Sequence, residues 1–133
     1  MKKGFTLVEL LAVIVILAVI MVISVPIVLN VINNSKKSAF ETDVKSLIDI
    51  TILNYETYDG NGNPTTIYDF SIPNISNELV GFKGDLPISG TITLVVNNDR
   101  ITGVTVSNLK SKDGLWCANK TSNSDNIEIE ECQ

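Results

Sequence analysis

Histidine is absent from the 133 residues, and only two cysteines are present, Cys117 and Cys132. The missing imidazole removes the commonest general base and metal ligand of proteins. The two cysteines form no CxxC pair and have no further partners for a zinc site. The sequence also contains no GxSxG and no phosphate-binding loop. We therefore expect no enzymatic activity, no cofactor and no metal site.

Positive charge is scarce as well. The net charge is −5, and residues 30–133 contain 8 Lys and Arg against 14 Asp and Glu. The basic residues of this part cluster no further than the pair Lys36-Lys37. Because an acidic surface repels phosphate groups, the charge balance counts against nucleic acid as the main partner.

Polar residues are almost missing from residues 10–29, where Ser24 and Pro26 are the only ones outside the apolar class. About 20 residues at a rise of 1.5 Å give about 30 Å, the thickness of the hydrocarbon core of a bilayer. Two lysines, Lys2 and Lys3, precede this run, as in a signal peptide or a signal anchor. No A-x-A-like cleavage site follows it. The sequence therefore predicts a segment that spans a membrane.

One carboxylate, that of Glu9, stands at the beginning of the apolar run. A carboxylate at the centre of a membrane helix costs about 3 kcal/mol, and less near an end. In one interpretation Glu9 is a solvated residue at the level of the headgroups. In the other, cleavage between Gly4 and Phe5 creates an α-amino group four residues before Glu9. A bundle of helices would then pair the amine of one subunit with Glu9 of another, in a medium of low dielectric constant.

The N-terminus resembles the class III signal of type IV prepilins and pseudopilins, through the residues Lys2-Lys3-Gly4-Phe5-Thr6-Leu7-Val8-Glu9-Leu10. That signal has a short basic leader ending in Gly, then Phe, then Glu as the fifth residue of the processed chain. The resemblance implies cleavage after Gly4 by a prepilin peptidase and N-methylation of Phe5 by the same enzyme. Methylation leaves the amine basic, so its attraction to Glu9 is kept.

Pro26 interrupts the apolar run at the twenty-second position of the processed chain, where major pilins often carry a proline. A proline inside a helix removes one hydrogen bond and clashes with the preceding turn. Two interpretations remain open. Pro26 either ends the transmembrane segment, or it bends or locally melts the helix so that subunits pack in a curved filament.

Beyond residue 30 apolar side chains recur at spacings of three and four, at Phe40, Val44, Leu47, Ile48, Thr51, Tyr55 and Tyr58. This pattern predicts an amphipathic helix whose apolar stripe faces a following sheet. Glycine, asparagine and proline in residues 59–64 end the helix. Asp59, Asn61 and Asn63 resemble the start of a calcium-binding EF-hand loop, but Pro64 and Phe70 stand where Gly and Glu are required. We therefore interpret the segment as a turn.

The last third of the chain has the patterns of short strands. Residues 91–96 and 100–106 predict a hairpin around Asn97-Asn98-Asp99, and residues 115–117 and 127–129 are candidate strands. We expect an α+β, pilin-like fold, with one long N-terminal helix packed on a small antiparallel sheet. The expected division is a leader (1–4), a transmembrane or filament-core helix (5–29), an amphipathic helix (30–58), a connecting loop (59–90), and the sheet with a C-terminal disulfide loop (91–133).

The state of the two cysteines depends on the compartment. They are two buried free thiols, or they form a disulfide if this part of the chain is exported. The resemblance implies the disulfide, because many members of the family have such a loop, here from Cys117 to Cys132.

The resemblance implies a structural subunit of a type IV pilus-like filament, with copies of itself, a prepilin peptidase, an assembly ATPase, an inner-membrane platform protein and the membrane as partners. Before assembly the subunit would cross the cell membrane once, with a cytoplasmic N-terminus. Afterwards it would lie in an extracellular or periplasmic filament. The alternatives are a pseudopilin of type II secretion or of DNA-uptake (competence) machinery, and a minor tip pilin that binds a ligand.

Overall fold

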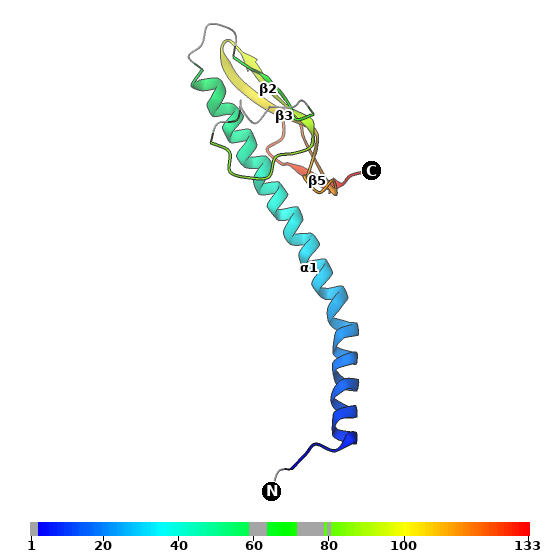
Figure 1. The fold of residues 1–133 in the computed structure, drawn as a ribbon. Coiled ribbons are helices and arrows are strands. Elements are labelled where there is room, and N and C mark those ends of the chain that lie inside the picture. The colour runs from blue at the N-terminus through cyan, green and yellow to red at the C-terminus, as the bar shows by residue number, and fades with distance from the viewer. Residues whose placement is uncertain (1–2, 59–63, 72–78, 80) are drawn as a thin grey trace. The chain divides into compact units, whose positions relative to one another are not determined.

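The computed structural model describes residues 3–58, 64–71, 79 and 81–133. Within them the order of elements is α1 (Leu7–Glu56), β1 (Ile67–Asp69), β2 (Ser89–Asn97), β3 (Arg100–Lys110), β4 (Trp116–Lys120) and β5 (Glu128–Glu131), as Figure 1 shows. The chain divides into two compact units, Met1–Lys36 and Lys37–Gln133, and α1 contributes residues to both.

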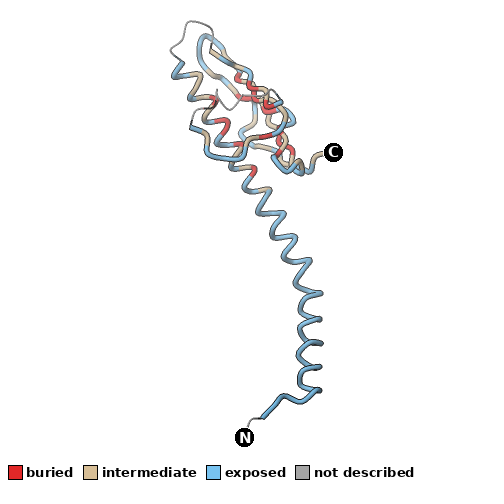
Figure 2. The backbone as a smooth tube through the Cα atoms, viewed as in Figure 1, coloured by how far each residue is buried: buried red, intermediate tan, exposed pale blue. Residues whose placement is uncertain are grey.

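In the first unit α1 is apolar on all sides over residues 10–29. Every residue from Leu7 to Lys36 is exposed, and Figure 2 shows this stretch in a single colour. By length and composition the helix is able to cross a membrane. A helix that is hydrophobic all round belongs in apolar surroundings, which this unit does not supply from its own described residues.

Pro26 lies inside α1, and the helix continues through it to Glu56. The helical segment therefore does not end at Pro26, and the residues beside it keep the α-helical conformation. The backbone carbonyl of Val22, four residues earlier, loses the hydrogen bond that the missing N–H of Pro26 would have donated.

In the second unit α1 buries the predicted stripe. Phe40, Val44, Leu47, Ile48 and Thr51 are buried. The four apolar residues of this stripe belong to the hydrophobic core, and the polar Thr51 is buried on the same face. The other members of the core are Tyr68, Phe70, Leu79, Ile92, Leu94, Val104, Val106, Leu109 and Ala118. The stripe ends earlier than predicted. Tyr55 packs against the core, whereas Tyr58 follows the helix and is 42% exposed.

The strands form one antiparallel sheet in the order β1-β2-β3-β4-β5. Strands β2 and β3 are joined at Asn98 and Asp99, whose φ angles are 51° and 59°. Positive φ at both central residues is what a type I′ turn requires, and this turn matches the twist of the strands. The predicted hairpin is thereby confirmed, with strands longer than the sequence pattern indicated.

Strand β1 lies within the stretch that the sequence predicted to be only a connecting loop. Ile67–Asp69 pairs with β2, and Tyr68 between them is 2% exposed. Three residues are too few for an alternating pattern to stand out. The rest of that predicted loop includes residues 59–63, 72–78 and 80, so the calcium-like turn lies largely outside the described residues.

A segment before β2 is tied to α1 through Asp43. The carboxylate of Asp43 accepts a hydrogen bond from the backbone N–H of Asp85, and Asp85 pairs with Lys112 at 2.9 Å. Burial raises the pKa of Asp43 and the charge of Asp85 adds to this, while the hydrogen bond from Asp85 opposes it. The ionised form of Asp43 therefore destabilises the second unit.

Replacing Asp43 by Asn keeps an acceptor for the N–H of Asp85 and removes the charge. As the pH rises through about 4, the unfolded chain loses this proton before the folded unit does, so the folded unit loses stability in that window. We expect D43N to raise the free energy of unfolding at neutral pH by ~0.5 kcal/mol, the scale of a partly exposed charge interaction. The gain should disappear at about pH 3. Urea unfolding of the full chain in detergent, followed by Trp116 fluorescence, measures it; an equal gain at both pH values would contradict the argument.

Candidate processing and assembly site

The beginning of α1 is closed by a pair of reciprocal hydrogen bonds. The backbone N–H of Thr6 donates to Oε2 of Glu9 at 2.8 Å, and the N–H of Glu9 donates to Oγ1 of Thr6 at 3.2 Å. Since α1 begins at Leu7, Thr6 is the N-cap and Glu9 is the third helical residue. This is a capping box, which satisfies two N–H groups that the first helical turn leaves without partners.

The capping box also fixes where the carboxylate of Glu9 lies relative to the predicted cleavage point. Oε2 of Glu9 is 2.8 Å from the nitrogen of Thr6, and the nitrogen of Phe5 is the preceding backbone nitrogen. Backbone geometry separates successive nitrogens by about 3 Å, so an amine released at Phe5 would lie within about 6 Å of this carboxylate. The structure thus brings together Phe5 and Glu9.

The predicted cleavage point itself is accessible. Gly4 is exposed, Phe5 is 91% exposed, and both precede the helix. Apart from its two neighbours in the chain, no described residue lies within 4 Å of a Cβ built on Gly4. Pro26, the third residue of the predicted assembly site, lies several helical turns further along α1.

Thr6 is the residue that the sequence interpretation missed. Threonine followed three residues later by glutamate, directly before an apolar run, is the sequence signature of a capping box. The carboxylate of Glu9 therefore caps the helix of its own chain.

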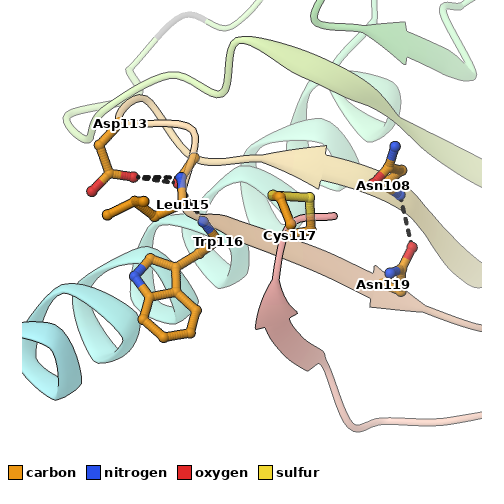
Figure 3. The surroundings of a disulfide bond; sticks show 8 residues. Asn108, Asp113, Leu115, Trp116, Cys117 and Asn119 are labelled. Carbon is orange, nitrogen blue, oxygen red and sulfur yellow. Dashed lines mark hydrogen bonds between the residues drawn. A yellow bond between two sulfur atoms is a disulfide. The ribbon is translucent and has the colours of Figure 1, made fainter.

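The disulfide between Cys117 and Cys132 is formed, so the interpretation as two free thiols is wrong. The Cα atoms are 5.0 Å apart, and the bond links β4 to the residues just after β5 (Figure 3). The N–H of Cys132 also donates to the carbonyl of Leu115 at 2.9 Å. The cross-link closes a loop with a sequence separation of 15, for which the expected stabilisation is about 3 kcal/mol. It holds the edge strand β5 against β4.

Comparison with known proteins identifies the N-terminus. Residues 1–25 match the family model of the prokaryotic N-terminal methylation motif. The chain thus carries the class III signal of type IV pilins and pseudopilins, and the motif supports a type IV pilin-like or pseudopilin protein. Neither the curated proteins nor the solved structures gave a significant match. The architecture, one long helix with an antiparallel sheet, is pilin-like.

We predict that Thr6→Val loosens the first turn of α1, because valine cannot accept the hydrogen bond of the Glu9 N–H. Loss of an N-cap costs about 0.5–2 kcal/mol, so the amides of this turn should exchange with solvent roughly 2- to 30-fold faster. Hydrogen exchange of the full chain in detergent measures this. Thr6→Ser should behave as wild type, and Thr42→Val, which removes a hydroxyl bonded to the Ser38 carbonyl, should leave this turn unchanged. Unchanged exchange in Thr6→Val would show that the cap is not formed in solution.

Proposed function

We propose that the chain is the precursor of a structural subunit of a type IV pilus-like filament, cut between Gly4 and Phe5 by a prepilin peptidase and assembled through α1. The observation that carries the proposal is the methylation motif at residues 1–25, continued by a helix whose apolar side chains are exposed. Its role is architectural and not enzymatic. Its partners are copies of itself, the peptidase that the motif implies, an assembly ATPase and a platform protein in the membrane.

The physical basis of assembly is an exchange of one apolar environment for another. As a precursor, the subunit crosses the cell membrane once with its N-terminus in the cytoplasm, and lipid covers residues 5–29. In an extracellular or periplasmic filament, the helices of other copies cover the same side chains. Because the apolar area removed from water is similar in both places, the hydrophobic effect alone favours neither strongly. Polar groups in this segment then decide the balance.

Glu9 is the acidic group that decides it. Cleavage creates an amine at Phe5 within reach of the Glu9 carboxylate of the same chain, and a neighbouring copy offers a second amine. A buried carboxylate with an amine partner is stabilised, whereas an unpaired one is strongly unfavourable. The capping box holds the carboxylate at the start of the helix, where either amine meets it. Lys2 and Lys3 orient the precursor before this pair exists.

Two related functions remain as alternatives within the same class. A pseudopilin of type II secretion or of DNA-uptake machinery would share the motif and the fold. A minor tip pilin that binds a ligand is a second alternative. The presence of Glu9 favours the body of a filament over its tip, because only inner subunits have neighbours on both sides for charge pairing.

The substitution Glu9→Gln separates the two tasks of Glu9. Glutamine at this position of a capping box still accepts the N–H of Thr6, so the helix begins as before. The charge is lost, and the buried amine of Phe5 loses its partner, which typically costs about 3–5 kcal/mol. We expect normal amounts of processed subunit in the membrane and no filaments. Glu9→Leu should give the same result, and Glu9→Asp should assemble partially because it keeps the charge with a shorter reach.

The measurement is the ratio of sheared filament to membrane-held subunit, in cells that lack the wild-type copy. Thr6→Val is the matched control, since it weakens the cap and keeps the charge. Normal filament yield from Glu9→Gln would show that Glu9 only caps its own helix.

A further inference from the structure

The second unit begins at Lys37, and this lysine lies over an aromatic ring. Its ammonium group is 5.7 Å from the centre of the Trp116 ring. The indole Nε1 of Trp116 is buried and has no hydrogen-bond partner among the described residues. An unpaired buried N–H is unfavourable, and phenylalanine would avoid it. Tryptophan is, however, the best of the aromatic partners for a cation. The contact with the ammonium of Lys37 therefore explains a tryptophan at this position, although its N–H forms no hydrogen bond among the described residues.

The turn between β3 and β4, which leads directly into Trp116, presents two more side chains. Oδ1 of Asp113 accepts hydrogen bonds from the Ser111 hydroxyl and from the N–H of Leu115, at 2.6 Å and 3.1 Å. The turn held in this way leaves Leu115 49% exposed, next to Trp116 (Figure 3). Lys112 in the same turn is 68% exposed. We call Lys37, Lys112, Leu115 and Trp116 the Lys37–Trp116 patch.

The charges around the patch leave its lysines able to change partners. Lys112 pairs with Asp85, whose side chain is 64% exposed, and such exposed ion pairs contribute little to stability. The carboxylate of Asp113 is already engaged within its own turn. The pair with Asp85 therefore leaves the ammonium of Lys112 exposed to external anions.

The chain itself keeps the patch close to a membrane. Lys37 follows Leu29, the last residue of the apolar run, by eight residues, and eight residues span at most about 28 Å. Tryptophan and lysine are the side chains that anchor proteins at the boundary between bilayer and water. The second unit as a whole is acidic: residues 37–133 hold 7 Lys and Arg, with the two lysines of the patch included, against 14 Asp and Glu. An anionic surface therefore repels most of this unit and attracts the part with cations beside apolar side chains.

We propose that the Lys37–Trp116 patch docks the folded second unit onto the anionic headgroups of the membrane that α1 spans, on the side where this unit lies. The proposal rests on the proposed function, because it requires a subunit held in the bilayer before assembly. Docking gives the unassembled subunit a defined resting orientation. Entry into a filament then requires the patch to leave the headgroups, so the lipid composition of the membrane affects extraction.

Trp116 is the only tryptophan of the chain, so its fluorescence reports this patch alone. The full chain is reconstituted into phosphatidylcholine vesicles with or without phosphatidylglycerol, and a lipid carrying a nitroxide on its headgroup serves as the quencher. We expect strong quenching of Trp116 only when phosphatidylglycerol is present, and its loss in high salt. Lys112→Gln should lower the ratio of docked to undocked protein roughly fivefold, the effect expected of one lysine at an anionic surface.

Arg100→Gln is the matched control, with the same change of charge. Arg100 lines a cavity together with Tyr55 and Glu56, at the other end of the helical segment of this unit. Tyr55 lies 18 residues beyond Lys37, about 27 Å along the helix. Leu115→Ser is the second variant; it removes apolar area, changes no charge, and should also reduce quenching. Retention of the disulfide and of the circular dichroism spectrum shows that each variant is folded.

Equal quenching with and without phosphatidylglycerol, or equal effects of Lys112→Gln and Arg100→Gln, would overturn the proposal. Quenching that follows the protein-to-lipid ratio instead of phosphatidylglycerol would also overturn it, by assigning the patch to a second copy of the chain. Flotation of the vesicles after an alkaline wash tests the membrane-held subunit separately. If the chain floats with the vesicles but its Trp116 quenching does not depend on phosphatidylglycerol, the docking proposal is contradicted and the membrane-held subunit is not.

Discussion

An apolar helical segment with nothing of its own to cover it is the constraint on which the rest of the molecule depends. Residues 7–36 of α1 are exposed throughout, and among residues 10–29 only Ser24 and Pro26 lie outside the apolar class. In water the apolar surface of residues 10–29 is unfavourable, since burial of each CH₂ group is worth ~0.8 kcal/mol. The segment therefore requires lipid or other helices. The capping box and the class III signal both lie at the beginning of this segment.

The second unit meets the opposite requirement, since it must be stable on its own in water. Its core joins one face of α1 to an antiparallel sheet that ends in the short edge strand β5. A strand of four residues at an edge has few contacts to hold it, and the disulfide from Cys117 to Cys132 supplies a covalent one. Under the proposed function, the first unit would move from lipid to the helices of other copies, and the second unit would stay folded during that move.

Patterns that are local in sequence were readable in advance, and contacts between distant segments were not. The spacing of Phe40, Val44 and Leu47 predicted the buried face of α1, because one helix repeats its own geometry. Asn98 and Asp99 predicted the hairpin, because the residues of a short turn are also neighbours in sequence. Strand β1 was missed because three residues carry no period, and its partner lies more than twenty residues away. The Lys37–Trp116 contact joins residues even further apart, so only the fold reveals it. The capping box was present in the sequence as Thr6-x-x-Glu9 and could have been predicted. It was missed because Glu9 was interpreted only through its charge, without Thr6.

The central claim, that this chain is processed to expose an amine next to Glu9, is tested most directly by the intact mass of the protein isolated from cells that contain a prepilin peptidase. Relative to the unprocessed, reduced chain, the account predicts the loss of residues 1–4, the gain of one CH₂ from N-methylation, and the loss of two hydrogen atoms from the disulfide. Reduction should restore those two hydrogen atoms and leave the methyl group at Phe5. A mature protein that still begins at Met1, or one cut beyond Leu29 so that the apolar helix is lost, would contradict it.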